Sequence, residues 1–193
     1  MSHGSASAGL PLKKASREGR TIVFIDESGI SQRPHRVRTW APRGVTPVLQ
    51  DCFNGKTLSA VAGVTFWNFY FQLHPGPIRA PQGVEFPDAL KRQVRGPLQV
   101  IWDRLPAHRS ALVRRYVEAS GGRIEVEFLP AYAQELNPVE YLWGYWKQHE
   151  LANVCPQKFW QLGAVARMAL KKMKRKPKRL FGAFWQQAEL SLN

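Results

Sequence analysis

Two short apolar runs that each end in aspartate restrict the fold more than any other feature of this sequence. They are "TIVFID" at residues 21–26 and "LQVIWD" at residues 98–103. Continuous apolar runs of this length predict strands that are covered on both faces, and this implies helices on both sides of a sheet. If the two strands are parallel neighbours, Asp26 and Asp103 emerge side by side at one edge of the sheet, where ligands of open α/β sheets bind.

The remaining pattern predicts an α/β fold, with a mixed sheet flanked by helices. In chain order we expect an irregular hairpin at 38–50, two strands within 58–74 that meet near Trp67 and Asn68, a helix at 86–94, a helix at 108–120, a half-exposed strand at 124–128, a helix at 137–150 and two final helices. We divide the chain into a flexible leader or linker at 1–19, one domain at 20–155 and a basic C-terminal helical extension at 156–193.

The charge balance favours a polyanionic partner. The chain has 28 lysine and arginine residues against 14 aspartate and glutamate residues, a formal net charge of +14 at pH 7. A field of this size attracts nucleic acid before specific contacts form. No apolar run approaches the roughly 20 residues that span a bilayer, and no signal region is present, so we expect no membrane contact and a soluble, cytoplasmic protein. Cys52 and Cys155 are too isolated for a zinc site or a disulfide framework.

Asp26 and Asp103 have two alternative interpretations. Carboxylates held close together repel each other unless a proton or a cation lies between them, and Mg²⁺ is the cation that suits an all-oxygen site. The alternative is that each aspartate caps a turn after its strand, because "DESG" and "DRLP" are both turn-like. The occurrence of two apolar strands with the same ending favours the metal site.

Glu140 also has two interpretations. Asn137 and Pro138 form a typical helix start, and Glu140 stands three residues after Asn137, where it would complete a capping box. The residues from Val139 to Trp146 predict a buried helix face, and Glu140 lies about 100° from Val139, at the border of that face. It could therefore either cap its helix or point along the sheet edge as a metal ligand.

Four stretches carry a family resemblance. They are "IVFIDESG", "RTWAPRG", "VIWDRLPAHRS" and "FLPAYAQELNPVEYLW". In this order they resemble the endonuclease domain of DDE transposases of the mariner-type and bacterial insertion-sequence superfamily, over about residues 20 to 150. The resemblance implies a ribonuclease H-like fold with Asp26, Asp103 and Glu140 as catalytic, metal-binding residues, and the 36 residues between Asp103 and Glu140 suit the family. Many members have asparagine after the second aspartate, whereas this chain has Arg104.

The implied activity is DNA strand cleavage that depends on two Mg²⁺ ions, with Mn²⁺ as a substitute, followed by transfer of the freed 3′-hydroxyl into target DNA. Such transposases act on DNA, and we expect a dimer in the DNA complex. They also carry an N-terminal helix-turn-helix, and we expect that nothing before Thr21 can form one. We therefore expect an upstream partner or a frame fused by frameshifting, or a truncated relic. The alternatives are a catalytically idle DNA-binding relic and a ribonuclease H-like nuclease on other substrates.

Several basic and aromatic residues are candidates for DNA contact. Trp40 could stack on a base, although core packing is favoured for it, as it is for Trp143 and Trp146. His108 could touch a phosphate or the attacking water, or be an exposed residue at a helix start, and we expect Glu27 and Glu135 to be solvent or turn residues. The basic run at 171–179 is either a phosphate-binding tail or a solvated linker. The candidate DNA-binding residues are Arg36, Arg38, Trp40, Arg43, Arg104, His108, Lys171, Lys172, Lys174, Arg175, Lys176, Lys178 and Arg179.

Overall fold

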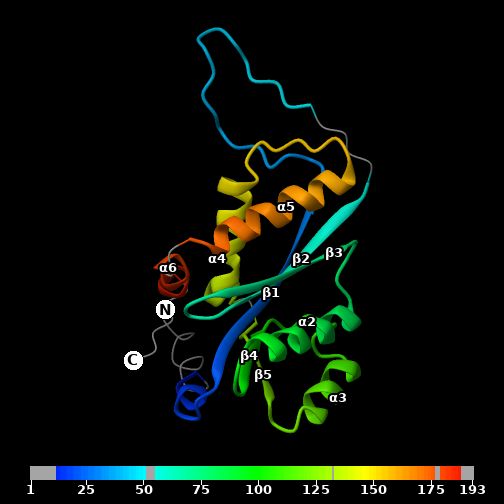
Figure 1. Cartoon of the computed structure of the whole chain (residues 1–193), viewed down its shortest axis with the longest axis vertical. Coiled ribbons are helices and arrows are strands. Elements are labelled where there is room, and N and C mark those ends of the chain that lie inside the picture. The colour runs from blue at the N-terminus through cyan, green and yellow to red at the C-terminus, as the bar shows by residue number, and fades with distance from the viewer. Residues whose placement is uncertain (1–11, 51–54, 132, 177–178, 188–193) are drawn as a thin grey trace.

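A mixed sheet forms the centre of the molecule (Figure 1). The computed structural model describes residues 12–50, 55–131, 133–176 and 179–187. Within these residues the strands are β1 (Thr21–Ser31), β2 (Thr57–Val64), β3 (Phe69–Pro75), β4 (Leu98–Trp102) and β5 (Ile124–Phe128), in the order β3-β2-β1-β4-β5. The β1, β4 and β5 strands are parallel, whereas β2 and β3 are antiparallel to their neighbours. The predicted parallel pairing of the two aspartate-bearing strands is therefore confirmed.

Helices cover both faces of this sheet, as the fully apolar strands require (Figure 1). The helical elements are α2 (Ala80–Gln93), α3 (Ala111–Ala119), a 3₁₀ turn η1 (Gln134–Leu136), α4 (Pro138–Tyr145), a π-helical turn η2 (Trp146–Glu150), α5 (Phe159–Lys174) and α6 (Arg179–Gln187). The α2 and α3 helices pack on one face, and α4, α5 and α6 pack on the other. Each face has its own hydrophobic core, and the predicted α/β class is confirmed.

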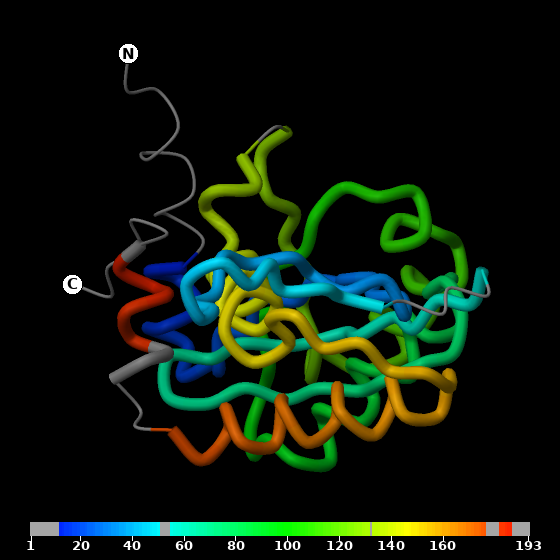
Figure 2. Tube along the Cα trace, turned by 90° about the horizontal axis from the view of Figure 1, so that it is seen from above, coloured from blue at the N-terminus to red at the C-terminus, as the bar shows by residue number. Residues whose placement is uncertain are grey.

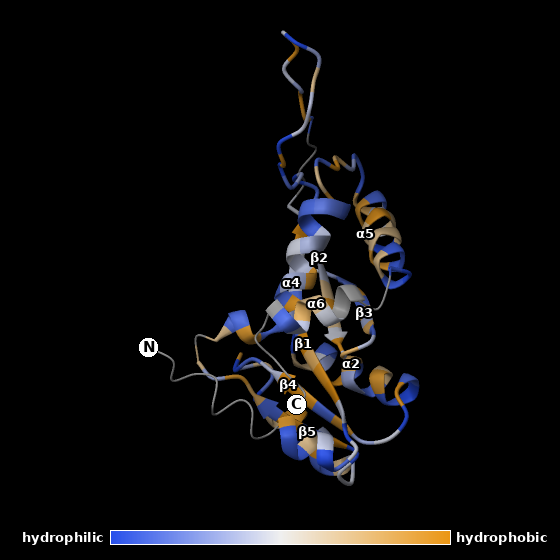
Figure 3. Ribbon diagram, turned by 90° about the vertical axis from the view of Figure 1, so that its left-hand side faces the viewer, coloured by the Kyte–Doolittle hydropathy of each residue, from blue (hydrophilic) through white to orange (hydrophobic). Residues whose placement is uncertain are grey.

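The β1 strand supplies side chains to both cores because successive residues point to opposite faces. Phe24 belongs to the core under α4 and α5, whereas Val23 and Ile25 belong to the core under α2 and α3. Figure 3 shows the apolar strands at the centre of the molecule. Continued alternation places Asp26 on the α4 side of the sheet and Glu27 on the α2 side.

The β1 strand does not end at Asp26, and this corrects the expectation from the sequence. It continues to Ser31 because its second half pairs with β2, for example Ser28 with Ala60. Its pairing with β4 stops earlier, at Phe24 and Ile101. Asp26 therefore lies where β1 extends beyond β4, and the edge expected for the two aspartates still exists.

The C-terminal helices belong to the same body as the sheet. Trp185 of α6 packs edge-on against Phe24 of β1, with ring centroids 5.2 Å apart. Figure 2 shows α5 running along the β2–β3 hairpin, and Lys174 lies over the ring of Tyr70 in β3. The predicted extension at 156–193 thus shares a core with the predicted domain at 20–155.

Three local predictions differ from the structure. Residues 12–17 of the predicted flexible leader are helical, with Leu12 and Ala15 buried, while residues 1–11 lie outside the described residues. The predicted hairpin at 38–50 contains no strand. It belongs to the segment 36–50, called the projecting segment below, which extends from the molecule (Figure 1). The α2 helix begins at Ala80 rather than Phe86, because a proline suits the first turn of a helix. Among the described helices, none is long and apolar enough to cross a membrane.

Candidate functional site

Three elements bring the predicted acids to one cavity of about 620 Å³. Asp26 comes from β1, Asp103 directly follows β4, and Glu140 lies in the first turn of α4. Glu27 and Glu135 also line this cavity. The three residues that the resemblance selects therefore share one site, although they come from distant parts of the chain.

Asp26 is the most buried of these acids, with 8% of the residue exposed. The indole Nε1 of Trp143 donates a hydrogen bond to Asp26 Oδ2 over 3.0 Å. Burial, followed by repulsion from Glu140 and Glu27, raises the pKa of the Asp26 carboxyl to about 8. At neutral pH this group therefore holds a proton unless a cation takes the place of that proton.

Asp103 has a different environment, in which donors surround one of its oxygens. Asp103 Oδ1 accepts hydrogen bonds from the Leu105 backbone N–H over 3.0 Å and from His108 Nδ1 over 2.5 Å. Burial acts to raise its pKa, but these hydrogen bonds outweigh burial and leave the pKa of Asp103 below its ordinary value. The turn-capping interpretation is thus correct for the geometry of Asp103, while Asp26 lies within a strand.

Glu140 is exposed and stands on the wall of the cavity. The predicted cap of α4 is Asn137, whose Oδ1 accepts from the Val139 backbone N–H over 3.1 Å. Asn137 Nδ2 also donates to the carbonyl oxygen of Ile25 over 3.5 Å, and this bond ties the start of α4 to β1 beside Asp26. In the described part of the chain, the cap of α4 is made by the Asn137 side chain and not by the Glu140 carboxylate, and this favours the interpretation in which Glu140 points along the sheet edge.

The surroundings of His108 and Glu27 differ from those predicted from the sequence. His108 is only 2% exposed, so the alternative of a solvent-exposed residue at a helix start is wrong. Its Nε2 lies 3.2 Å from Glu27 Oε1, and the Glu27 side chain is 14% exposed rather than solvated. Burial acts to lower the pKa of His108, but Asp103 and Glu27 outweigh it and raise this pKa to about 9. The alternation of β1 could have indicated the burial of Glu27, because it places Glu27 on the same face as Val23 and Ile25, which are buried under α2.

The donor atoms at this site suit a hard divalent cation. Carboxylate oxygens are the ligands that Mg²⁺ and Mn²⁺ prefer, and burial together with repulsion from Glu140 and Glu27 raises the pKa of Asp26. Among the described residues, no three acids, histidines or cysteines stand close enough together to form a ready-made metal site. Mg²⁺ commonly binds through one or two protein carboxylates together with water and substrate phosphate, so the residues fit such an ion.

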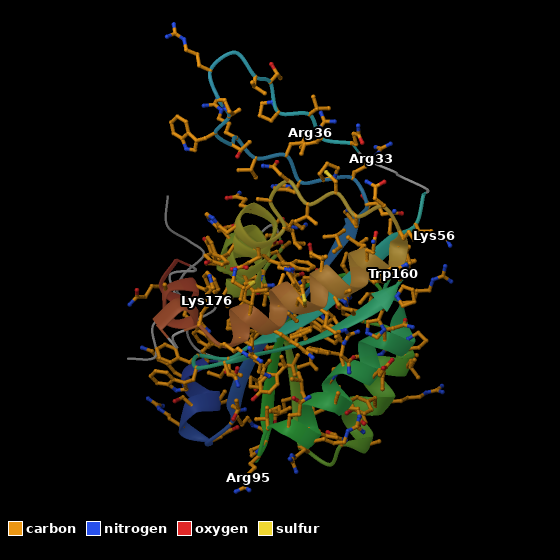
Figure 4. The ribbon with its side chains drawn as sticks, turned by 45° about the horizontal axis from the view of Figure 1, so that its top comes forward. Arg33, Arg36, Lys56, Arg95, Trp160 and Lys176 are labelled. Carbon is orange, nitrogen blue, oxygen red and sulfur yellow. The ribbon has the colours of Figure 1, made fainter. Side chains whose placement is uncertain are left out.

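The candidate DNA-binding residues near the N-terminal half lie on the projecting segment or at the cavity. Arg36, Arg38, Trp40 and Arg43 belong to the projecting segment, and Trp40 is fully exposed, so the expected core packing of Trp40 is wrong. Figure 4 shows Arg36 on this segment and Arg95 at the opposite end of the molecule. Trp143 and Trp146 are buried, as predicted.

Arg104 contributes the one cationic side chain among the described residues that line the cavity. Its Nε donates to the Leu129 carbonyl oxygen over 2.9 Å, and this bond ties the guanidinium to the end of β5. Arg104 is therefore part of the cavity wall, next to Asp103 in the sequence.

Several lysines of the predicted basic tail contact other residues of the same chain. Glu150 of η2 pairs with Lys172 over 2.8 Å and with Lys176 over 2.9 Å. Lys174 lies over the Tyr70 ring, 4.9 Å from its centroid. Lys171 and Arg175 are exposed, whereas Lys178 and the side chain of Arg179 lie outside the described part of the chain. These ion pairs fix the end of α5, so the run is not simply a solvated linker.

Comparisons with known proteins agree with this arrangement. The family model of the DDE superfamily endonucleases matches residues 21–162, a range that includes all three acids. Among solved structures, the Mos1 transposase paired-end complex with the left transposon end matches with a TM-score of 0.67 at 20% identity, over 93% of this chain and 56% of that chain. The catalytic domain of the Mos1 mariner transposase matches with a TM-score of 0.62 at 18% identity, over 93% of this chain and 85% of that chain.

These likenesses establish the fold, and they confirm that it is ribonuclease H-like. The chain spans little more than half the length of the Mos1 chain in the paired-end complex. No curated protein shows significant sequence similarity to it.

Proposed function

The chain belongs to the DDE superfamily endonucleases, and we propose that it is the catalytic domain of a mariner-type transposase that cuts DNA and transfers the freed 3′ end. The observation that carries this proposal is the shared cavity of Asp26, Asp103 and Glu140. These residues come from strand β1, from the position directly after the parallel strand β4, and from helix α4, and their convergence on one cavity fits a common chemical task.

We propose that these three carboxylates hold two divalent ions together with substrate phosphate. Related Mos1 paired-end complexes contain Mn or Mg, and this supports the choice of cation. Such ions activate a water or hydroxyl nucleophile and stabilise the leaving oxygen of a phosphodiester. The protein contributes fixed oxygen atoms: Trp143 orients Asp26, and Leu105 and His108 orient Asp103. Arg104 would then neutralise charge on the same phosphate.

DNA is the proposed substrate. The net charge of +14 favours it, and the matching Mos1 structures include a paired-end complex with a transposon end and a strand transfer complex. A dimer on DNA and a helix-turn-helix supplied upstream belong to the same proposal. Arg36, Arg38 and Arg43 on the projecting segment are the proposed backbone contacts away from the cavity.

The test is nicking of supercoiled plasmid DNA in Mg²⁺ or Mn²⁺, with Glu140→Gln compared with Glu135→Gln. Both glutamates line the cavity and both are exposed, so the two variants differ mainly in which carboxylate is lost. We expect Glu140→Gln to lower the rate by at least about 100-fold, or roughly 3 kcal/mol of transition-state stabilisation, and Glu135→Gln to stay within a few-fold of the parent. Equal rates in the parent and Glu140→Gln would contradict the proposed role, and an inactive parent that binds DNA would favour an idle relic.

A further inference from the structure

His108 is buried beside the proposed catalytic site. It lies in the turn between β4 and α3, and only 2% of it is exposed. Its imidazole stacks on the indole of Trp102, with ring centroids 4.0 Å apart and an angle of 18° between the planes. Since the ring is buried and stacked, it has little freedom to turn, and its two nitrogens point in fixed directions.

Both nitrogens of His108 meet carboxylates. Nδ1 lies 2.5 Å from Asp103 Oδ1, and Nε2 lies 3.2 Å from Glu27 Oε1. Among the described residues, Glu27 and Asp103 are the carboxylates that lie within ion-pair distance of the His108 ring. Nδ1 donates a hydrogen bond to Asp103 Oδ1, whereas Nε2 and Glu27 Oε1 are at ion-pair distance without hydrogen-bond geometry.

The two oxygens of Asp103 have different surroundings. Oδ1 receives two donors, the Leu105 backbone N–H over 3.0 Å and the imidazole. Within the described residues, Oδ2 accepts no hydrogen bond. A carboxylate held in this way offers one defined oxygen to a cation, and partners behind a ligand commonly set its orientation and affinity.

We propose that Glu27 and His108 form a positioning pair, in which Glu27 holds the imidazole and the imidazole fixes Asp103 so that Oδ2 is presented to the metal. This inference rests on the proposed function of Asp103 as a metal ligand. Glu27 is then a positioning residue rather than a fourth ligand, and its place on the α2 side of β1 agrees with this role. The pair connects β1, β4 and the turn before α3 at the point where the cavity is built.

The test measures Mn²⁺ binding by calorimetry, with and without a short DNA duplex, for three variants of His108. In His108→Asn the amide N–H lies near the position of Nδ1 and can still donate to Asp103, whereas in His108→Gln it lies near Nε2 and can serve only Glu27. His108→Ala keeps neither donor. Thermal unfolding without metal reports whether each variant is folded.

We expect His108→Ala and His108→Gln to lose about tenfold or more in Mn²⁺ affinity and His108→Asn to stay within a few-fold of the parent. A packing role would give the reverse order, because glutamine fills more of the space left by histidine than asparagine does. Binding by His108→Gln that equals or exceeds binding by His108→Asn would therefore overturn the proposal, and if His108→Ala fails to fold, the comparison of the other two still decides it.

Glu27→Gln and Asp103→Asn complete the experiment. The positioning role predicts a loss in Glu27→Gln no larger than that in His108→Ala, whereas a loss as complete as that in Asp103→Asn would identify Glu27 as a ligand and overturn the proposal. If the parent binds Mn²⁺ and Asp103→Asn does not, unaffected His108 variants would refute only the positioning pair. If Asp103→Asn binds like the parent, or neither binds, the metal site itself fails.

Discussion

Asp26 is a buried carboxyl group with other acids around it, and its titration reports directly on the site. Its pKa is raised to about 8 by burial and by repulsion from Glu140 and Glu27. Asp103, which is close to the same cavity, has its pKa lowered by hydrogen bonds despite burial. Two aspartates with opposite shifts give two opposite predictions for how stability depends on pH.

Without metal, Asp26→Asn should stabilise the protein at pH 8. Above about pH 4 the unfolded state ionises this aspartate, whereas the native state keeps the proton until about pH 8, so the parent loses stability across that range. The variant avoids this loss, which is of the order of a few kcal/mol because one pKa unit corresponds to about 1.4 kcal/mol. Thermal unfolding in a chelating buffer should show the difference growing from pH 4 to pH 8.

Asp103→Asn is the matched control, and its expected effect on stability has the opposite sign. Since the pKa of Asp103 is lowered in the native state, its contribution to stability is present above its ordinary pKa and is lost as the pH falls. Removal of this carboxylate should therefore destabilise the protein at neutral pH. An Asp26→Asn variant that melts below the parent at pH 8 would show that the native state stabilises an ionised Asp26, which contradicts a raised pKa.

At the scale of elements, α4 carries both a proposed ligand and the donor that orients another. Asn137 and Pro138 start this helix, and Asn137 also bonds to the Ile25 carbonyl oxygen of β1. One turn further, Trp143 reaches Asp26. The docking of α4 against β1 thus sets the relative positions of Glu140 and Asp26.

Trp143→Phe should weaken metal binding, whereas Trp146→Phe should not. Both tryptophans are buried in the same helical region, but only Trp143 donates to Asp26, and the Nε1 of Trp146 has no hydrogen-bond partner among the described residues. Loss of the Trp143 donor leaves Asp26 Oδ2 without its fixed partner, and we expect Mn²⁺ affinity to fall by about tenfold. Equal Mn²⁺ affinities in the two variants, measured by calorimetry, would argue against an orienting role for Trp143.

The sequence predicted those elements whose cause is local. The apolar runs of β1 and β4 and the Asn137–Pro138 helix start each have a local physical reason, and all three appear in the structure. The extension of β1 to Ser31 depends on pairing with β2, and the segment at 38–50 has turn residues but no partner strand. The contact between Glu27 and His108 joins residues from different elements, so neither residue's neighbours in the sequence revealed it.

At the scale of the whole molecule, the cationic side chains are spread over several surfaces, and some form ion pairs with acids of the same chain. Glu150 pairs with two lysines of the basic run, and Asp88 pairs with Lys91 and Arg92 on α2. The projecting segment (Figure 1), by contrast, extends away from the sheet, and its residues Arg36, Arg38 and Arg43 are exposed. Its arginines are therefore open to contact with a polyanion.

Replacement of Arg36, Arg38 and Arg43 by alanine should reduce the salt dependence of DNA binding. Each phosphate contact contributes about 0.9 to the slope of log affinity against log salt concentration, so the loss of three contacts should lower the slope by up to about 3. A control with Arg95, Arg114 and Arg115 replaced removes the same charge from exposed positions elsewhere. Equal slopes for both triple variants, measured by fluorescence anisotropy, would show that the segment contributes only through net charge.

The most direct test of the metal site is a calorimetric titration of Mn²⁺ into the parent and into an Asp26→Asn/Asp103→Asn double variant, each with and without a DNA duplex. The cavity and its crowded carboxylates predict saturable binding in the parent that the double variant loses. Equal binding by the two proteins, or no binding by the parent even with DNA present, would contradict a metal-dependent site at the edge shared by β1 and β4.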